Sequence, residues 1–318
     1  MFKHISIEEL HPTFGAEVSG VDFSKSLDDE VFEEIKQAIY KYGVLVFRDT
    51  GITDELHVEF GERFGEIEDA SPFVKDGKYR LSDTRLFDLS NMDADGNIVV
   101  PETLHGVWNK GNTIFHTDLS YNPHRAGISI LAAHELPPPG NGGTTEFADL
   151  RAAFDDLPEE QKNELRTKGY IGSHSVWHSR QLASPEVEIL WKFKPDEHPV
   201  SKHKIYQIHE GSGRETLYIA SHIFRIDGMS QEEFDAFYPP LYAFAQRPEN
   251  IFSVEWKQPG DIVMWDNTSV MHRGTGGNFT GKYRRDMRRA TVYDGGKEGW
   301  GVNQRDAQFQ GLLQEASG

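Results

Sequence analysis

Residues 254–272 read VEWKQPGDIVMWDNTSVMH, and this stretch decides the expected fold. Val254–Lys257, Ile262–Trp265 and Val270–His272 are short runs of β-branched, aromatic and other apolar residues, which favour strands. The Pro259–Asp261 segment between the first two runs has the composition of a tight turn. Short strands at close spacing, joined by such turns, are typical of antiparallel sheets that pack as a sandwich or barrel.

The rest of the chain supplies further strands and a set of outer helices. Strands are expected at Val44–Phe47, Gly127–Ala133, Ile205–Ile208, Thr216–Ala220 and Arg284–Tyr293. Helices are expected from Ser26 and Asp29 up to Gly43, from Thr53 to Gly65, over Leu150–Leu157, and from Ser230 until Pro239-Pro240 interrupts it. We therefore predict a mainly β protein with flanking helices, whose core is a double-stranded β-helix of the jelly-roll, cupin-like type.

No internal repeat or convincing linker divides the 318 residues, so a single domain, 1–318, is expected. Within it, residues 1–68 are predicted to form an N-terminal layer of helix and strand. Residues 69–111 lack a sustained period and lead directly into His116, so we expect an active-site lid there. Residues 112–294 are predicted to form the jelly-roll core with a helical insert, and residues 295–318 a C-terminal tail.

The composition excludes several classes of site and partner. The chain has no cysteine, so disulfides, thiol nucleophiles and thiolate metal sites are excluded, and any metal must be held by nitrogen and oxygen. The formal net charge of -18 argues against general binding to nucleic acid or to an anionic membrane. No apolar run approaches membrane-spanning length, and Met1–Val18 lacks the apolar stretch of a signal peptide, so a cytoplasmic location is expected.

Residues 115–121, FHTDLSY, hold the first candidate metal ligands. Their apolar, β-branched and aromatic neighbours favour a strand, and residues two apart on a strand project from the same face. His116 and Asp118 would then point into one space. Two histidines and one carboxylate commonly hold iron(II) in enzymes without haem and leave its other positions open. The site therefore needs a second histidine from elsewhere in the chain.

Position alone leaves the second histidine open. His272 lies at a strand edge far along the chain, and distant strands face each other across a jelly roll. His222 and His209 also lie near predicted strands and are alternatives by the same argument. A purely structural role for His116 also remains open at this point, because a His-x-Asp triplet is equally consistent with a histidine that is hydrogen-bonded to a nearby acid and binds no metal.

The final predicted strand carries a dense set of arginines. Arg285 and Arg289 share one face of this strand, whereas Arg284 and Arg288 share the other. An arginine that faces the interior is costly unless it meets an anion, and its planar guanidinium suits a carboxylate. An inward pair beside a metal would therefore indicate an acidic ligand, although alternation does not tell which face is inward.

Several motifs occur in an order that carries a resemblance. They are His116-Thr117-Asp118, Gly142-Gly143-Thr144-Thr145, Trp265-Asp266-Asn267 leading to His272-Arg273-Gly274, and Arg285 with Arg289 before Ala290-Thr291. Together they resemble the taurine dioxygenase and 2,4-dichlorophenoxyacetate dioxygenase family of iron(II)/2-oxoglutarate-dependent oxygenases, from about His11 to Asp294. The Thr145–Ala153 stretch and the Gly211–Arg214 turn are closer to the phenoxyacetate branch.

The resemblance implies roles for the residues that match the family motifs. His116, Asp118 and His272 would be the catalytic iron ligands. Thr145 and Arg285 would hold the distal carboxylate of 2-oxoglutarate, whose other carboxylate and keto oxygen chelate the metal. The cofactors implied are Fe(II), 2-oxoglutarate and O2.

The resemblance also implies a substrate side. Arg289 matches a position near both substrate and co-substrate, Asn112 matches a polar position on the substrate side, and Lys75 is a nearby lid cation. The implied reaction converts 2-oxoglutarate to succinate and CO2 and hydroxylates a small organic acid, aryloxyalkanoate-like or amino-acid-like. The alternatives are a His/His/Asp zinc hydrolase and a non-catalytic jelly-roll binding protein. Family relatives are often dimers or tetramers, which leaves a homo-oligomer open.

Overall fold

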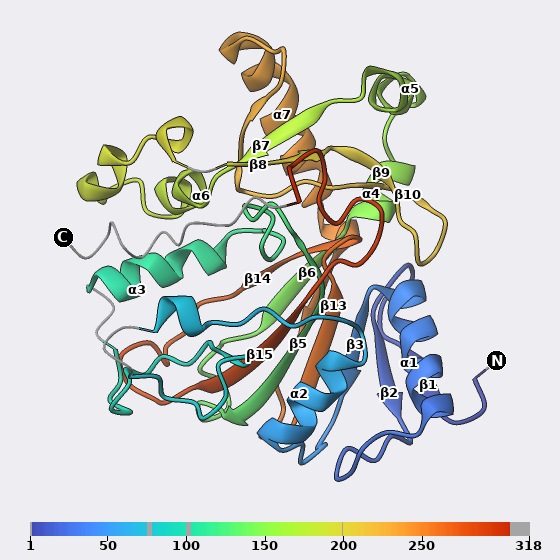
Figure 1. Cartoon of the computed structure of the whole chain (residues 1–318), viewed down its shortest axis with the longest axis vertical. Coiled ribbons are helices and arrows are strands. Elements are labelled where there is room, and N and C mark those ends of the chain that lie inside the picture. The colour runs from blue at the N-terminus through green and yellow to red at the C-terminus, as the bar shows by residue number, and fades with distance from the viewer. Residues whose placement is uncertain (1, 75–77, 100–102, 199, 306–318) are drawn as a thin grey trace.

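A seven-stranded sheet runs through the centre of the protein (Figure 1). The computed structural model describes residues 2–74, 78–99, 103–198 and 200–305. The strands lie in the order β1-β2-β3-β13-β5-β15-β4, and β13 is antiparallel to both β3 and β5. Their bounds are β1 Ser6–Glu9, β2 Ala16–Ser19, β3 Val44–Phe47, β4 Phe87–Asp88, β5 Ala126–Glu135, β13 Ile262–Asp266 and β15 Asp286–Tyr293.

A three-stranded sheet packs against one face of the large sheet. Its order is β12-β6-β14, with bounds β6 Thr145–Asp149, β12 Ile251–Val254 and β14 Val270–Gly274. Side chains of both sheets meet in one hydrophobic cluster, which includes Val46, Leu131, Val263, Trp265 and Met287 from the large sheet and Phe147, Val254 and Val270 from the small one. The predicted mainly β architecture with a two-sheet core is confirmed.

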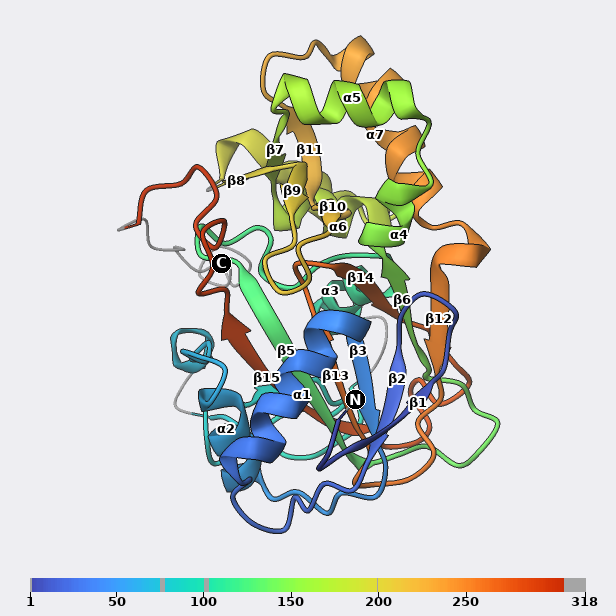
Figure 2. The ribbon, with the colours of Figure 1, turned by 90° about the vertical axis from the view of Figure 1, so that its right-hand side faces the viewer.

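Two helices cover the other face of the large sheet (Figure 2). They are α1 Asp29–Tyr42 and α2 Asp54–Glu62. Helix α1 ends at Gly43, whose φ of 70° is left-handed and suits a residue without a Cβ. Helix α2 begins at Thr53, whose side chain accepts a hydrogen bond from the Leu56 backbone N–H. The end of α1 and the start of α2 therefore follow local chemistry that is visible in the sequence.

A helical insert and two small sheets lie beyond one end of the core (Figure 2). The sheets have the orders β11-β7-β8 and β10-β9. The strands are β7 Ile171–His174, β8 Ser201–Lys204, β9 Tyr206–Ile208, β10 Glu215–Leu217 and β11 Ile223–Ile226. The remaining helices are α3 Leu104–Asn109, α4 Leu150–Asp155, α5 Glu159–Lys168, α6 Val176–Ala183 and α7 Gln231–Ala245, and the short 3-10 helices are η1 Ser71–Phe73, η2 Lys110–Thr113, η3 Glu188–Lys192, η4 Pro195–Glu197 and η5 Pro248–Asn250.

Three expectations about the helices were wrong. Pro239-Pro240 does not interrupt α7, because both prolines lie inside it and the burial of Phe234, Tyr238, Leu241 and Ala245 outweighs the lost hydrogen bonds. Asp28, not Ser26, is the N-cap of α1, and its side chain makes no capping hydrogen bond. Helix α2 ends at Glu62 rather than extending to Gly65.

The described residues of the predicted lid, within 69–111, form short elements only. They are η1, β4, α3 and the start of η2, and β4 joins the large sheet by pairing with β15. Lys75 lies outside the described residues. No helix in the described part of the chain is long and apolar enough to cross a membrane.

Candidate active site

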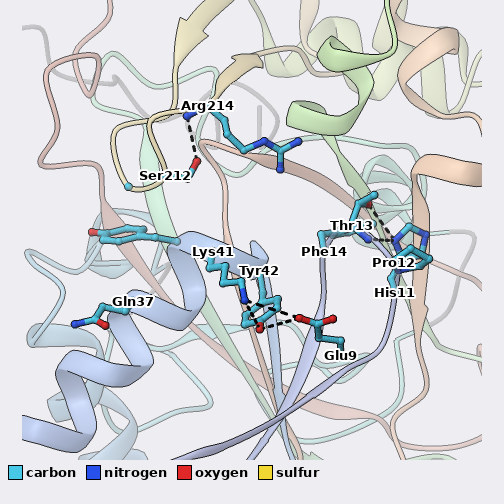
Figure 3. A pocket seen from close by; sticks show the side chains of 12 residues that line it. Glu9, His11, Pro12, Thr13, Phe14, Gln37, Lys41, Tyr42, Ser212 and Arg214 are labelled. Carbon is cyan, nitrogen blue, oxygen red and sulfur yellow. Dashed lines mark hydrogen bonds and ion pairs between the residues drawn. The ribbon is translucent and has the colours of Figure 1, made fainter. Parts of the chain in front are cut away.

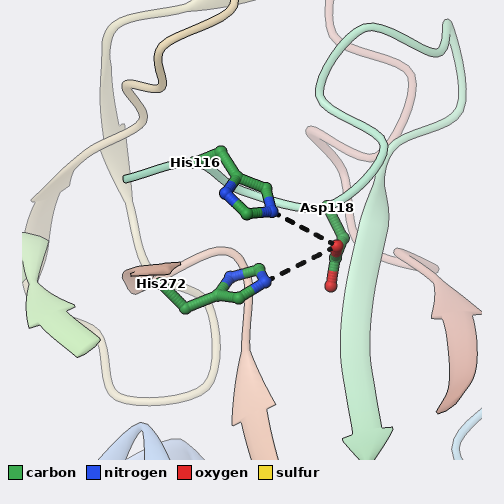
Figure 4. Close-up of side chains that lie close together, drawn as sticks. All are labelled: His116, Asp118 and His272. Atoms are coloured by element: carbon green, nitrogen blue, oxygen red, sulfur yellow. Dashed lines mark ion pairs between the residues drawn. The ribbon is translucent and has the colours of Figure 1, made fainter. Parts of the chain in front are cut away.

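His116, Asp118 and His272 converge at the end of the two-sheet core (Figure 4). The Nε2 atom of His116 lies 4.0 Å from Oδ1 of Asp118, and Nε2 of His272 lies 3.6 Å from the same oxygen. One candidate ligand atom from each side chain lies within 4.8 Å of the other two. Backbone hydrogen bonds of 2.9 and 2.8 Å between His116 and His272 join the two segments.

The stretch FHTDLSY is not a strand, which corrects the sequence prediction. His116 makes an isolated antiparallel bridge with His272, and residues 118–120 form a turn. Leu119 has a φ of 50°, which ends the extended conformation, and the backbone N–H of Asp118 donates to Oδ1 of Asn267 instead of to a neighbouring strand. His116 and Asp118 therefore meet through a bridge and a turn rather than through strand alternation.

The protonation states of the three side chains suit a divalent metal. Burial lowers the pKa of His116 to about 4, although Asp118 acts to raise it, and burial also lowers the pKa of His272 well below its ordinary value. Burial acts to raise the pKa of Asp118, but Arg289 and the two histidines outweigh it and lower this pKa to about 2. Near neutral pH the site offers two neutral imidazoles and one carboxylate, as metal ligands require.

The carboxylate of Asp118 is held by residues from two strands. Ser129 on β5 donates its hydroxyl to Oδ2 over 2.7 Å, and Arg289 on β15 donates from Nη1 to Oδ1 over 2.6 Å. Asn267 donates from Nδ2 to the Ser129 oxygen over 2.9 Å and so orients that hydroxyl. Sequence reasoning missed Ser129, whose signal is a polar residue within the apolar run of β5. These contacts fix the orientation of the carboxylate.

The other candidate histidines are engaged elsewhere. His222 shares a hydrogen bond of 2.9 Å with the Ser120 hydroxyl, and its ring centre lies 6.0 Å from that of His116. His209 contacts the Asp266 carboxylate over 2.7 Å. Neither joins the group that could hold a metal among the described residues, so the geometry selects His272.

Arg285 lies near the segment that leads into Thr145, which begins β6, the central strand of the three-stranded sheet. Nη2 of Arg285 lies 3.5 Å from the carbonyl oxygen of Gly143, two residues before Thr145. Burial lowers the pKa of Arg285 to about 10, and its Nε has no hydrogen-bond partner among the described residues. The Thr145 hydroxyl accepts a hydrogen bond of 3.1 Å from Trp256. A buried cation without an anion is costly, so this corner is suited to bind a carboxylate.

A surface pocket of about 500 Å³ lies elsewhere, between α1 and the turn at Gly211 (Figure 3). Lys41 and Tyr42 from α1, Glu9 from β1 and Arg214 from the turn are among its lining residues, which include none of the three converging residues. By contrast, His116, Asp118 and His272 are each at most 6% exposed. The cluster of metal-binding side chains, not this pocket, is therefore the candidate active site.

The chain matches known proteins along nearly its whole length. Residues 6–291 match the family described as "Taurine catabolism dioxygenase TauD, TfdA family". The chain belongs to this family. The alpha-ketoglutarate-dependent 2,4-dichlorophenoxyacetate dioxygenase of Burkholderia sp. (strain RASC) is 34% identical over 288 residues, which are 91% of this chain and 94% of that relative.

Two further proteins are similar to this TauD/TfdA-family chain along most of its length. The (S)-phenoxypropionate/alpha-ketoglutarate-dioxygenase of Sphingobium herbicidovorans is 30% identical, over 89% of this chain and 93% of the relative. The crystal structure of AAD-2 in complex with Mn(II) and N-oxalylglycine superposes with a TM-score of 0.79 at 35% identity, over 92% of this chain and 98% of AAD-2. The family membership favours a dioxygenase over the zinc hydrolase and the binding protein.

Asn112 is the remaining described residue with a predicted role in this TauD/TfdA protein. It lies half-buried in η2, four residues before His116, and its backbone oxygen is near Gly274 on β14. The structure thus places it next to the strand that carries His272. Together with Lys75, which is outside the described residues, it remains a predicted substrate contact.

Glu68 is a buried acid beside the site that sequence reasoning missed. Its backbone N–H donates to the Thr291 oxygen on β15, and Ile67, one residue earlier, pairs with Val292 in the core on the α2 side. Because successive residues face opposite sides, Glu68 points toward the Arg289 side of the sheet. Burial raises the pKa of Glu68 from 4.5 to about 7, although Arg289 acts to lower it.

This shift predicts a pH-dependent effect of Glu68→Gln on stability. The folded state binds more protons than the unfolded state between pH 4.5 and 7, so the wild type loses stability as pH rises through this window. We expect Glu68→Gln to be more stable than wild type at pH 8, by about 3 kcal/mol, and equally stable at pH 4.5. Urea unfolding of the metal-free proteins at both pH values measures the difference. Glu66→Gln, at an exposed position two residues earlier, is the control, and an equal gain at both pH values would contradict the prediction.

Proposed function

We propose that this TauD/TfdA-family protein uses Fe(II), 2-oxoglutarate and O2 to hydroxylate a small organic acid. The observation that carries the proposal is the convergence of His116, Asp118 and His272 in one buried group. Arg285 supports it, because its guanidinium lies near the Gly143 oxygen, two residues before Thr145, without a carboxylate partner among the described residues. The relatives named as alpha-ketoglutarate-dependent enzymes also support it.

The three proposed ligands fit an iron site of the two-histidine, one-carboxylate type. The Nδ1 atom of His116 lies 2.8 Å from the Ile114 carbonyl oxygen, which can only accept, so Nδ1 carries the proton and Nε2 keeps its lone pair for the metal. No other metal-binding group of three such side chains occurs among the described residues. When bound, the metal supplies the oxidation in which substrate C–H, 2-oxoglutarate and O2 yield substrate C–OH, succinate and CO2.

The residues of the chain bind and orient the reactants. Arg285 and the Thr145 hydroxyl are proposed to hold the distal carboxylate of 2-oxoglutarate with parallel hydrogen bonds and a hydroxyl contact. Arg289 and Ser129 keep Asp118 ionised and fixed in orientation. The near-complete burial of the three ligands excludes water from the reacting groups.

The proposed substrate is a small carboxylic acid, aryloxyalkanoate-like or amino-acid-like. Arg289 lies next to Asp118 on β15, the strand that follows Arg285, with Nη1 on Asp118 and Nε on the Thr291 hydroxyl. Its Nη2 makes no hydrogen bond with the described residues and is available to an incoming carboxylate, with Asn112 and Lys75 as further contacts. Because the net charge is -18, long-range attraction does not gather acids, and recognition must rest on local contacts.

Release of succinate tests this function. The purified protein is incubated with Fe(II), 2-oxoglutarate and a panel of small organic acids that includes 2,4-dichlorophenoxyacetate and 2-phenoxypropionate. We expect at least one acid to raise succinate release above the acid-free level with iron, and none to do so with zinc. Turnover of a substrate with zinc and without 2-oxoglutarate would instead support a hydrolase.

Arg289→Ala tests the proposed contact with the substrate carboxylate. We expect the wild type to lose most of its turnover when an acid substrate is replaced by its methyl ester, because the ester removes the charge that Arg289 meets. The variant should discriminate between acid and ester far less. Steady-state succinate release measures both, and metal titration controls for damage to Asp118. Equal turnover of acid and ester by the wild type would show that Arg289 does not serve substrate recognition.

A further inference from the structure

Four arginines are less than a tenth exposed, and one of them differs from the others. Arg125 donates to Asp294 over 2.8 Å, Arg151 to Asp149 over 3.0 Å, and Arg289 to Asp118 over 2.6 Å. Arg180 on α6 is 7% exposed and makes neither a hydrogen bond nor an ion pair with the described residues. Its contact is with the ring of Trp108, whose centre lies 4.9 Å from the guanidinium carbon.

The guanidinium of Arg180 lies beside the proposed metal site. It covers Gly111 so closely that a Cβ at Gly111 would lie 1.6 Å from Nη1, which explains why a glycine occupies this position in η2. Helix η2 leads directly to His116. Ser179, the residue before Arg180, shares a hydrogen bond of 2.9 Å with Ser221, and the residue after Ser221 is His222, whose ring centre lies 6.0 Å from that of His116.

Arg285 and Arg180 are two guanidinium groups without a carboxylate partner among the described residues. The proposed reaction has two reactants that carry a carboxylate, 2-oxoglutarate and the acid substrate. Arg285 and Arg180 both have a buried Nε without a partner among the described residues, and burial lowers the pKa of each to about 10. A buried, unpaired guanidinium is costly, and such a cost is typical of a binding site that waits for an anion. The proposed 2-oxoglutarate accounts for Arg285, which leaves Arg180 for a second anion.

We infer that Arg180 binds the carboxylate of the substrate from the α6 side of the site, an inference that rests on the proposed function. A carboxylate has two oxygens with about four lone-pair positions, so it accepts Arg180 on one side while Arg289 approaches from β15. The ring of Trp108 supports the guanidinium plane and keeps it in place. Arg180 is then a specificity-determining residue that selects acids over neutral molecules.

Binding measurements with Arg180→Met test the inference without turnover. The protein is loaded with Mn(II) and N-oxalylglycine and titrated calorimetrically with 2,4-dichlorophenoxyacetate and with its amide. We expect the wild type to bind the acid at least about 30-fold more tightly than the amide, and Arg180→Met to lose most of this preference while Arg289 retains the rest. Arg225→Met, which removes an exposed arginine near the end of β11, should bind like the wild type.

Two outcomes would overturn the inference: wild-type affinity for the acid in Arg180→Met, or a wild type that does not prefer the acid to the amide. Urea unfolding of the metal-free variant separates binding from folding, because loss of an unpaired buried cation should not destabilise the protein, whereas loss of a structural contact should. Succinate release by the wild type is scored separately. Its absence with every acid would refute the proposed function, whereas altered acid binding alone concerns Arg180.

Discussion

His272→Ala is expected to abolish stoichiometric metal binding and to lower turnover by more than 100-fold. Changes in the shell around metal ligands already cost about 10- to 100-fold, so the loss of a ligand should cost more. The loss should come without unfolding, because the hydrophobic cluster that joins the two sheets does not include His272, although this residue lies in the middle of β14. Titration with Fe(II) under anaerobic conditions and circular dichroism measure the two properties.

His222→Ala is the matched control for this prediction. His222 is also buried, and its ring centre lies 6.0 Å from that of His116, but it belongs to no group that could hold a metal in the described part of the chain. This variant should therefore bind one metal ion per chain. Full activity in His272→Ala together with loss of metal in His222→Ala would reverse the assignment of the ligand.

Arg285→Ala is expected to raise the KM for 2-oxoglutarate by about 30-fold to more than 1000-fold. Breaking a buried hydrogen-bonded charge pair costs roughly 2 to 5 kcal/mol, and each 1.4 kcal/mol is about a tenfold change. Arg285→Lys should restore little of the affinity for 2-oxoglutarate, because the lysine ammonium lacks the planar guanidinium that donates to both carboxylate oxygens. Succinate formation at varied 2-oxoglutarate measures the effect.

Arg284→Ala is the control on the adjacent residue. Arg284 faces the other side of the chain and pairs with Glu135 over 3.0 Å in a half-exposed contact, which contributes little. Its removal should leave the KM for 2-oxoglutarate unchanged. An unchanged KM in Arg285→Ala as well would place the co-substrate at another position.

Local sequence chemistry determined much of the scaffold of this TauD/TfdA protein. The Val44–Phe47 run became β3 with the same bounds, and Ser230 with Glu233 formed the predicted capping box. These features depend on a few neighbouring residues, so propensity and turn chemistry suffice to predict them. The motifs around His116 and His272 carried the family resemblance, and thereby the expected class of reaction.

The tertiary structure decided what depends on residues far apart in the chain. Strand alternation put His116 and Asp118 together for the wrong reason, because a turn at Leu119 and the side chain of Asn267 set their orientation. The choice of His272 over His222 and the inward face of β15 likewise required the packing of the two sheets.

Arg180 shows the same limit most plainly. It lies in α6, between the expected helix over Leu150–Leu157 and the expected strand from Ile205, where we predicted no element. Whether a charged residue is buried and unpaired depends on every segment packed around it, and the local sequence pattern does not predict those contacts. The sequence by itself thus determined the class of scaffold and the first ligands, whereas the charges that surround the site were decided by the fold.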